Sequence, residues 1–134
     1  MCLELKWWSR IRVAKKDIVC YKVVTSEYKT PYYDYTMKPK PGYEYMADFN
    51  LGVIKVEFDS YGNRTVGDGV FHTLKDMDAA KEYLWVVKFE KVDDEAKILK
   101  CIIPKGSMYV KGTTDWRKHV SYGSKYLKII EEIK

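Results

Sequence analysis

Cysteine and histidine are scarce in this chain, and neither forms a metal-binding pattern. The three cysteines are scattered without a CxxC pair, and the two histidines, His72 and His119, lie far apart. Small secreted domains held by disulfides usually have many cysteines in an even number, whereas this chain has few and an odd number. No EF-hand spacing of carboxylates occurs either. The sequence therefore predicts no metal site, no cofactor and a reducing, cytoplasmic compartment.

Long apolar runs and chain breakers are also scarce. No uninterrupted apolar run approaches the roughly 18 residues of a membrane-spanning helix. Glu4, Lys6 and Arg10 interrupt the region where a signal peptide would need its apolar core. Only 8 Gly and 4 Pro occur, which excludes collagen-like and low-complexity chains. We expect one domain spanning residues 1–134, without integral membrane association.

Arginine is scarce too, because the basic residues are 20 Lys and 4 Arg. Their distribution is uneven: 1–40 carries nine basic and four acidic residues, 41–99 seven and twelve, and 100–134 eight and three. Two basic ends that meet in space would form a positive face. Nonspecific nucleic-acid binding through these ends is one hypothesis, although a dedicated reader of nucleic acid usually has more arginine.

Apolar periodicity predicts a strand-rich α+β fold. Expected strands are 18–24, 53–58, 64–70, 85–92, 98–103, 107–110 and 126–133, with a charged hairpin tip at 93–95. A helical end is the alternative for 126–133. One main helix is expected at about 76–85, because Asp76 suits an N-cap and apolar residues then recur at helical spacing. We expect this helix to pack on an antiparallel, strongly curved sheet or split barrel.

Tyrosine is concentrated in a segment that proline keeps from being regular. Residues 25–50 form a predicted long loop, with a short strand near Tyr43–Met46. Aromatic side chains among charges are the usual energetic centre of a protein interface. The candidate binding residues are therefore four tyrosines of this loop: Tyr32, Tyr33, Tyr35 and Tyr43. The alternative is a loop that its own tyrosine rings hold against the domain. Exposed tyrosines and edge strands also favour a dimer.

Motifs of catalysis are missing from the sequence. No phosphate-binding GxxxxGK[ST] or GxGxxG motif and no GxSxG motif occurs, and Glu131 and Glu132 are adjacent and point apart. His72 precedes the predicted helix, where side chains commonly line clefts. If the protein is an enzyme or binds nucleotides, the candidate residues are His72, Lys22 and Tyr83. A histidine bonded to a main-chain carbonyl is the simpler alternative. His119 follows a polar stretch and is expected to be exposed.

Three segments carry a family resemblance: CYKVV at 20–24, GVFHTLKDMDAAKEYL at 69–84, and CIIPKGSMYVKG at 101–112 with YGSKYLKI at 122–129. Together they resemble small uncharacterised proteins of phages and of bacteria that carry mobile elements. The resemblance covers these segments and leaves the tyrosine-rich loop unmatched, and it implies a fold and occurrence in phages and mobile elements. It implies no activity.

A remote and degenerate similarity is to the ADP-ribosyltransferase-like fold. Lys22 stands where the arginine class of that fold has arginine, and His72 and Thr73 match its central element. The chain departs from the pattern because the Ser-Thr-Ser motif is missing and no E-x-E or Q-x-E precedes Tyr126. Such transferases need that carboxylate to stabilise the charge on the sugar. The resemblance therefore implies at most a degenerate enzyme.

The sequence favours a small cytoplasmic protein-interaction module of phage origin that modulates a host protein. The alternatives are a nucleotide-binding protein or degenerate ADP-ribosyltransferase-like enzyme, and a nonspecific nucleic-acid binder.

Overall fold

β-Branched and aromatic residues build the strands that dominate this fold. The computed structural model describes residues 3–5, 8–27, 44–46, 56–58, 64–66, 71–91, 94–114 and 119–133. The longer strands are β3 (Ile18–Val24), β8 (Lys97–Ile103), β9 (Met108–Thr114), β10 (Val120–Ser124) and β11 (Tyr126–Ile133). The shorter strands are β1 (Leu3–Glu4), β2 (Ile11–Val13), β4 (Glu44–Met46), β5 (Val56–Phe58), β6 (Arg64–Val66) and β7 (Phe71–Leu74).

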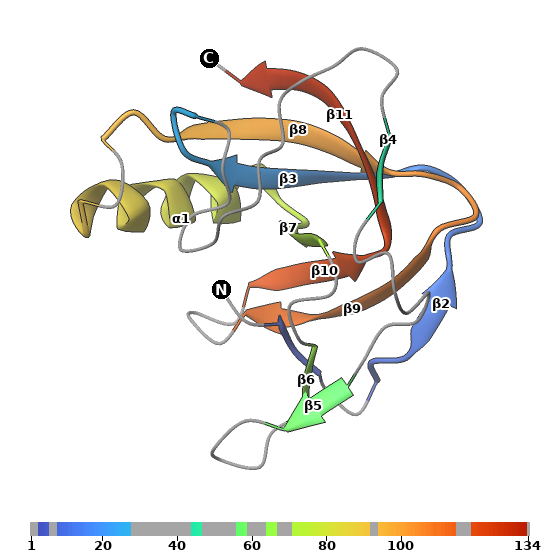
Figure 1. The fold of residues 1–134 in the computed structure, drawn as a ribbon. Coiled ribbons are helices and arrows are strands. Elements are labelled where there is room, and N and C mark those ends of the chain that lie inside the picture. Colours follow the sequence, from blue (N-terminus) through green and yellow to red (C-terminus); the bar gives the residue numbers. More distant parts are fainter. Residues whose placement is uncertain are drawn as a thin grey trace.

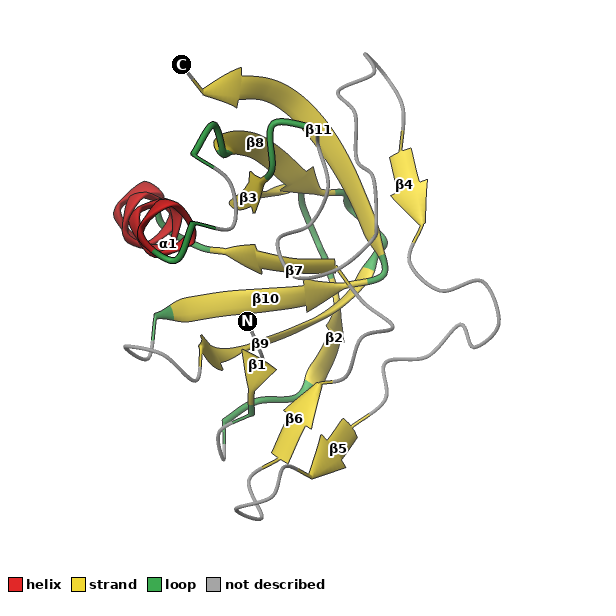
Figure 2. Ribbon diagram, turned by 60° about the vertical axis from the view of Figure 1, so that its left-hand side comes forward, coloured by secondary structure: helices red, strands yellow, loops and turns green. Residues whose placement is uncertain are grey.

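The described strands form one antiparallel sheet in the order β4-β11-β8-β3-β7-β10-β9-β1-β6-β5, with β2 paired to β9. The sheet does not close, since β4 and β5 lie at opposite ends of this order (Figure 1). Figure 2 shows its strong curvature and helix α1 beside it. The predicted strand-rich α+β class, with one helix on a curved antiparallel sheet, is confirmed.

Helix α1 (Met77–Phe89) begins where the sequence predicts and ends later. Asp76 is the N-cap residue, with extended backbone at φ −113° and ψ 146°, but its side chain makes no capping hydrogen bond. The expected strand at 85–92 is wrong, because the helix continues to Phe89. The expected hairpin tip at 93–95 is wrong for the same reason: this segment follows a helix and not a strand. Val87 is fully buried against the sheet, and this burial outweighs the strand propensity of the Trp-Val-Val run.

The two faces of the sheet carry separate apolar clusters. The helix face packs against α1 through Val23, Leu74 and Ile98 from the sheet and Ala80 and Val87 from the helix. The opposite face, here called the inner face, carries a second cluster drawn from β3, β7, β8, β10 and β11: Cys20, Val24, Phe71, Leu99, Cys101, Ile103, Tyr122, Leu127 and Ile129, together with Ala14. Alternation along each strand separates these two sets.

The remaining predicted elements are found with changed bounds or lie outside the described residues. β4 confirms the short strand predicted near Tyr43–Met46. The rest of the predicted loop at 28–43 and 47–50 lies outside the described residues, as do Tyr32, Tyr33, Tyr35 and Tyr43. In the described part of the chain, α1 is the only helix, and its 13 residues are too few to cross a membrane.

Candidate functional site

A buried lysine on the inner face is the most unusual polar feature of the described structure. Lys22 belongs to β3, between Cys20 and Val24 on the same face of the strand, and is only 5% exposed. Its Nζ donates a hydrogen bond to the main-chain oxygen of His72 on β7, at 2.9 Å. Lysine is almost never fully buried without a charged partner, so the surroundings of this amine identify the candidate site.

Strand pairing places polar groups on both sides of Lys22. Tyr21 pairs with Leu74 in antiparallel register, which puts Lys22 beside Thr73 on the inner face. On β10, Tyr122 pairs with Thr73 and so continues the same row across the sheet. On the other side of β3, Cys20 lies directly opposite Cys101 of β8, and both thiols are free and fully buried.

Burial controls the electrostatics of the Lys22 amine. Loss of water lowers the pKa of Lys22 from 10.5 to about 8, and the two neighbouring thiols, when ionised, oppose this shift. The amine therefore exists in both protonation states near neutral pH. Within the described residues, the hydrogen-bond partner of this ammonium is a neutral carbonyl. The free-energy cost of removing the ammonium from water is therefore not offset by an opposite charge among them.

The two thiols are held in their protonated form. Burial raises the pKa of Cys20 to about 12, while the Thr73 hydroxyl and the Lys22 ammonium pull it down. Burial raises the pKa of Cys101 still further, and Cys20 adds to that shift. Cys101 Sγ lies 3.6 Å from the Leu99 carbonyl oxygen, to which it donates a weak hydrogen bond. Both residues behave as small buried hydrophobic groups and not as nucleophiles.

Several buried hydroxyls close to this row have no partner within the described part of the chain. They are Thr73 Oγ1, Thr113 Oγ1, Ser121 Oγ and Ser124 Oγ. The effect of Thr73 on the Cys20 pKa therefore comes from proximity and not from a formed hydrogen bond. Buried hydroxyls are normally satisfied, and leaving one unpaired costs about 1–3 kcal/mol. Among the described residues, these buried polar atoms have no hydrogen-bond partner.

Two aromatic rings lie next to the hydroxyls. Tyr122 and Tyr109 meet edge to face, with ring centroids 6.0 Å apart and an angle of 71° between the planes. Burial raises the pKa of the Tyr122 phenol, and the thiol of Cys20 adds to the shift. Tyr109 pairs with Ser124, so that ring and hydroxyl share the inner face. The row that begins at Lys22 continues through Thr73 and Tyr122, and the neighbouring row carries Ser124 and Tyr109. These two rows of the inner face combine an amine, hydroxyl donors and aromatic surface.

The three sequence candidates for a catalytic or nucleotide-binding site do not converge. Lys22 and His72 are brought together, but through the main chain of His72. Strand alternation sends the half-buried His72 side chain toward the helix face, because Thr73 points inward. Tyr83 belongs to α1 and packs against the helix-face cluster. Among the described residues, no group of three potential metal ligands occurs.

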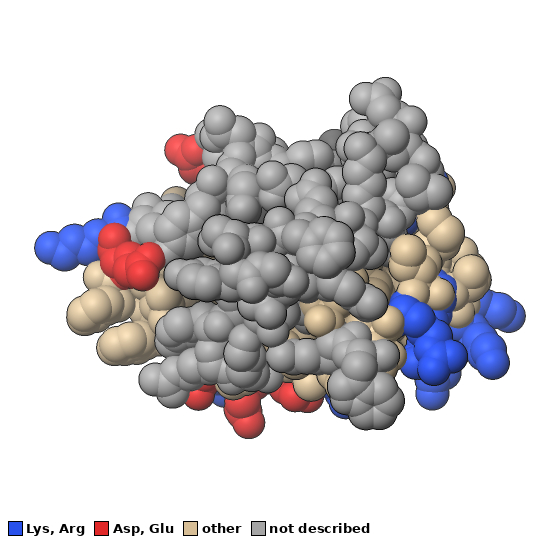
Figure 3. All heavy atoms as spheres, turned by 90° about the horizontal axis from the view of Figure 1, so that it is seen from below, with Lys and Arg blue, Asp and Glu red and all other residues tan. Residues whose placement is uncertain are grey.

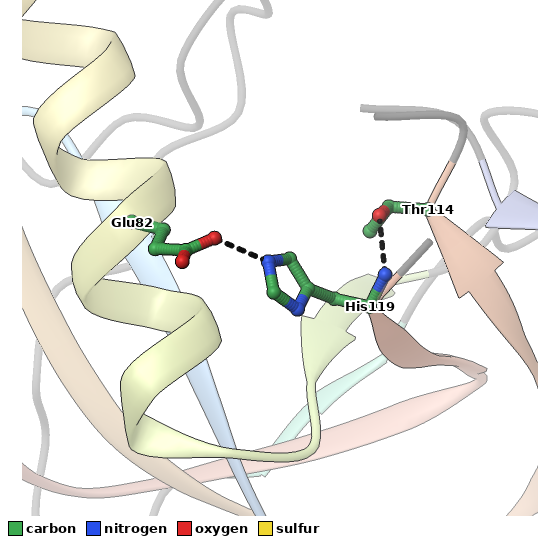
Figure 4. A network of polar contacts seen from close by, with 3 residues as sticks. All are labelled: Glu82, Thr114 and His119. Carbon is green, nitrogen blue, oxygen red and sulfur yellow. Dashed lines mark hydrogen bonds and ion pairs between the residues drawn. The ribbon is translucent and has the colours of Figure 1, made fainter. Parts of the chain in front are cut away.

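The second histidine connects helix and sheet. His119 Nε2 and Glu82 Oε2 of α1 are 2.5 Å apart, and the His119 main-chain N–H donates to Thr114 Oγ1 at 3.0 Å (Figure 4). His119 was expected to be exposed, but its side chain is only 28% exposed. The contact holds the start of β10 against α1 and is separate from the Lys22 row.

Sequence reasoning named Lys22 but missed its neighbours on the inner face, Thr73 and Tyr122, and the position of Cys101 opposite Cys20. These neighbours are determined by the register of the strand pairs, which cannot be derived from the local sequence. Lys22 was a candidate because it stands where the ADP-ribosyltransferase-like pattern has arginine. A lysine on the same strand face as Cys20 and Val24 is a further signal that could have pointed to it. Comparisons with protein-family models, with curated proteins and with solved structures find no match to this chain.

Proposed function

We propose that the protein binds a small ligand of the nucleotide class, with an anionic group of the ligand held by Lys22 on the inner face. The observation that carries the proposal is the buried Lys22 amine, whose hydrogen-bond partner is the neutral carbonyl of His72 at 2.9 Å. An anion at this amine would supply an opposite charge that the described residues do not provide.

The groups around Lys22 suit the rest of such a ligand. Thr73 and Ser124 supply buried hydroxyls that can donate to sugar or phosphate oxygens. Tyr109 offers a half-buried ring on the same face, which is suited to an aromatic base. An amine, hydroxyls and a ring in two neighbouring rows of the inner face match the phosphate, sugar and base of a nucleotide.

The proposal is one of binding and not of group transfer. The transferase that the sequence resemblance implies requires a carboxylate before Tyr126, and Gly123 and Ser124 occupy that region. Ser124 can donate a hydrogen bond, but it cannot stabilise a developing positive charge on a sugar.

Calorimetric titration with AMP, ATP, inorganic phosphate and uncharged adenosine tests the proposal. We expect AMP or ATP to bind and adenosine to bind at least tenfold more weakly. Lys22→Met should abolish that difference, since it keeps the length of the side chain and removes the charge. The matched control is Lys100→Met: Lys100 pairs with Tyr21 on the opposite face of the sheet. Equal affinity for AMP and adenosine would contradict the proposal, as would no binding at millimolar concentration.

A protein-interaction role is the second candidate, and one observation favours it. Trp85 and Phe89 of α1 are 62% and 70% exposed and stack on each other, with centroids 5.0 Å apart and 12° between the planes. Lys81 and Lys88 are exposed within one helical turn of Trp85. This surface fits an apolar pocket with an acidic rim on a partner protein, such as the host protein that a phage origin implies.

A pull-down from nuclease-treated bacterial lysate tests the second candidate. The expected result is one stoichiometric protein that Trp85→Ser/Phe89→Ser no longer captures. Lys75→Ser/Lys91→Ser, which changes two exposed positions flanking α1, should still capture it. Capture that survives the loss of both aromatic side chains would move the interaction to another surface, with the four loop tyrosines as the remaining prediction.

A further inference from the structure

The two basic thirds of the chain meet at one end of the fold. Gly106, with φ +92°, allows the tight turn between β8 and β9 that brings them together. Its N–H donates to the Ala14 carbonyl at 2.8 Å, and the Ala14 N–H donates to the Ser107 carbonyl at 2.9 Å. The Lys125 N–H donates to the Met108 carbonyl at 3.1 Å. These bonds join the segments 10–17, 104–108 and 124–126.

Six cationic side chains belong to these three segments: Arg10, Arg12, Lys15, Lys16, Lys105 and Lys125. All are exposed except the half-buried Lys125. We call this surface the basic end, and Figure 3 shows blue side chains gathered at one side of the molecule. Asp17 is the only acidic residue in these segments, and its Oδ1 already accepts the Lys105 N–H at 2.9 Å. The basic end therefore has a strong excess of positive charge.

We propose that the basic end binds the phosphate backbone of single-stranded nucleic acid, as a function separate from the Lys22 site. Clustered Lys and Arg side chains provide the affinity through release of counterions. Tyr126 adds a half-buried ring, with Lys125 Nζ 5.7 Å from its centroid. Cations beside an aromatic ring are the pattern that single strands use, with phosphates on the cations and a base against the ring.

Strand alternation separates this proposal from binding to a lipid surface. Ile11 and Val13 are exposed, but they pair with Val110 and Met108 and point to one face of β2. Arg12 pairs with Tyr109 and points to the other face. A membrane-binding surface needs apolar and cationic side chains on one face. Here they point apart, so nucleic acid is the favoured polyanion.

Fluorescence anisotropy with a labelled single strand of about 20 nucleotides tests the proposal between about 50 and 200 mM salt. Six phosphate contacts predict a slope of log affinity against log salt of about −4. The variant Arg10→Gln/Arg12→Gln/Lys15→Gln/Lys105→Gln should bring the slope to about −1 and lower the affinity at least tenfold at the lower salt concentration. A duplex of the same sequence should bind more weakly than the single strand.

The matched control removes the same number of charges from around α1: Lys75→Gln/Lys81→Gln/Lys88→Gln/Lys91→Gln. This variant should bind within about twofold of the native protein, because the phosphate contacts are retained. Lys22→Met should also leave the binding unchanged, which separates this proposal from the nucleotide site.

If the variant with four substitutions at the basic end does not fold, Lys15→Gln/Lys16→Gln/Lys105→Gln replaces it, since these three residues lie in turns. Three results would overturn the proposal: no binding at low salt, an equal loss in the α1 control, or binding to vesicles of anionic phospholipid without binding to the oligonucleotide.

Discussion

Lys22 on β3 and His72 on β7 are joined by a 2.9 Å hydrogen bond from a buried amine to a main-chain oxygen, across 50 residues of sequence. The bond connects neighbouring strands of the sheet. It satisfies one of three donors of the amine, and among the described residues no carboxylate is paired with its charge. The proposed ligand site, the pH dependence of stability and the effect of replacing Lys22 all follow from this arrangement.

The stability of the protein should depend on pH through Lys22. Burial lowers its pKa from 10.5 to about 8, so between these values the unfolded chain holds a proton that the folded chain has lost. Stability therefore rises with pH in this window. The full shift corresponds to about 3 kcal/mol as an upper figure. Relative to Lys22→Met, the native protein should gain about 1–3 kcal/mol between about pH 7.5 and 10, measured by urea unfolding.

Comparison with the variant isolates the lysine from the thiols. The pKa values of Cys20 and Cys101 are raised, so their contribution to stability is lost as pH rises above the ordinary thiol value of 9.0. Both cysteines are present in both proteins, and this loss therefore largely cancels in the difference. A difference that stays constant with pH would show that Lys22 titrates as it does in water.

The buried thiols should be chemically inert in the native protein. The thiolate is the reactive form, and burial suppresses it at both positions. In a Cys2→Ser background at about pH 8, a disulfide reagent should modify Cys20 and Cys101 at least ~100-fold more slowly than in denaturant. Rapid native-state modification of either residue would contradict their burial beside Lys22.

The C-terminal turn of α1, which the sequence did not predict to be helical, gives a test of the fold. Lys88 is exposed within the last turn, so replacing it changes the backbone and little else. Lys88→Pro should destabilise the protein by about 3 kcal/mol, and Lys88→Ala should be nearly neutral. Equal stability of the two variants in chemical denaturation would place the segment outside a helix.

The contact between Glu82 and His119 should contribute only modestly. The two side chains are 43% and 28% exposed, so water screens much of the interaction. A double-mutant cycle with Glu82→Gln and His119→Gln should give a coupling energy of about 0.5 kcal/mol. A coupling energy indistinguishable from zero would mean that the contact is not maintained in solution.

The elements that were predicted correctly are those in which the local sequence pattern and the tertiary environment favour the same secondary structure. β3 and β11 are rich in β-branched residues and were predicted with the observed bounds, and Asp76 marked the start of α1. β10 was missed because its sequence, VSYGS, has little strand propensity. Pairing with β7 and β9 on both sides makes it a strand. Tertiary contacts therefore determine that β10 is a strand and that α1 continues to Phe89.

The candidate site could be predicted only in part for a similar reason. The match of Lys22 to the arginine of the ADP-ribosyltransferase-like pattern made it a candidate, and its closeness to His72 was expected. The contact is made by the main-chain oxygen of His72, so the identity of the side chain at position 72 gives no indication of it. The positions of Thr73, Tyr122 and Cys101 follow from the register of three strand pairs. Register depends on the whole sheet, so these neighbours could not be derived from local sequence.

The pKa of Lys22 tests the central claim most directly. After reductive methylation with ¹³C-formaldehyde, the Lys22 resonance can be assigned by its loss in Lys22→Met and followed by NMR through a pH titration. The structure predicts a pKa of about 8 for the free protein, and a bound nucleotide phosphate should raise it. A pKa near the ordinary lysine value would contradict the burial of the Lys22 amine. A pKa that AMP and ATP leave unchanged would contradict the binding of their phosphate groups by this amine.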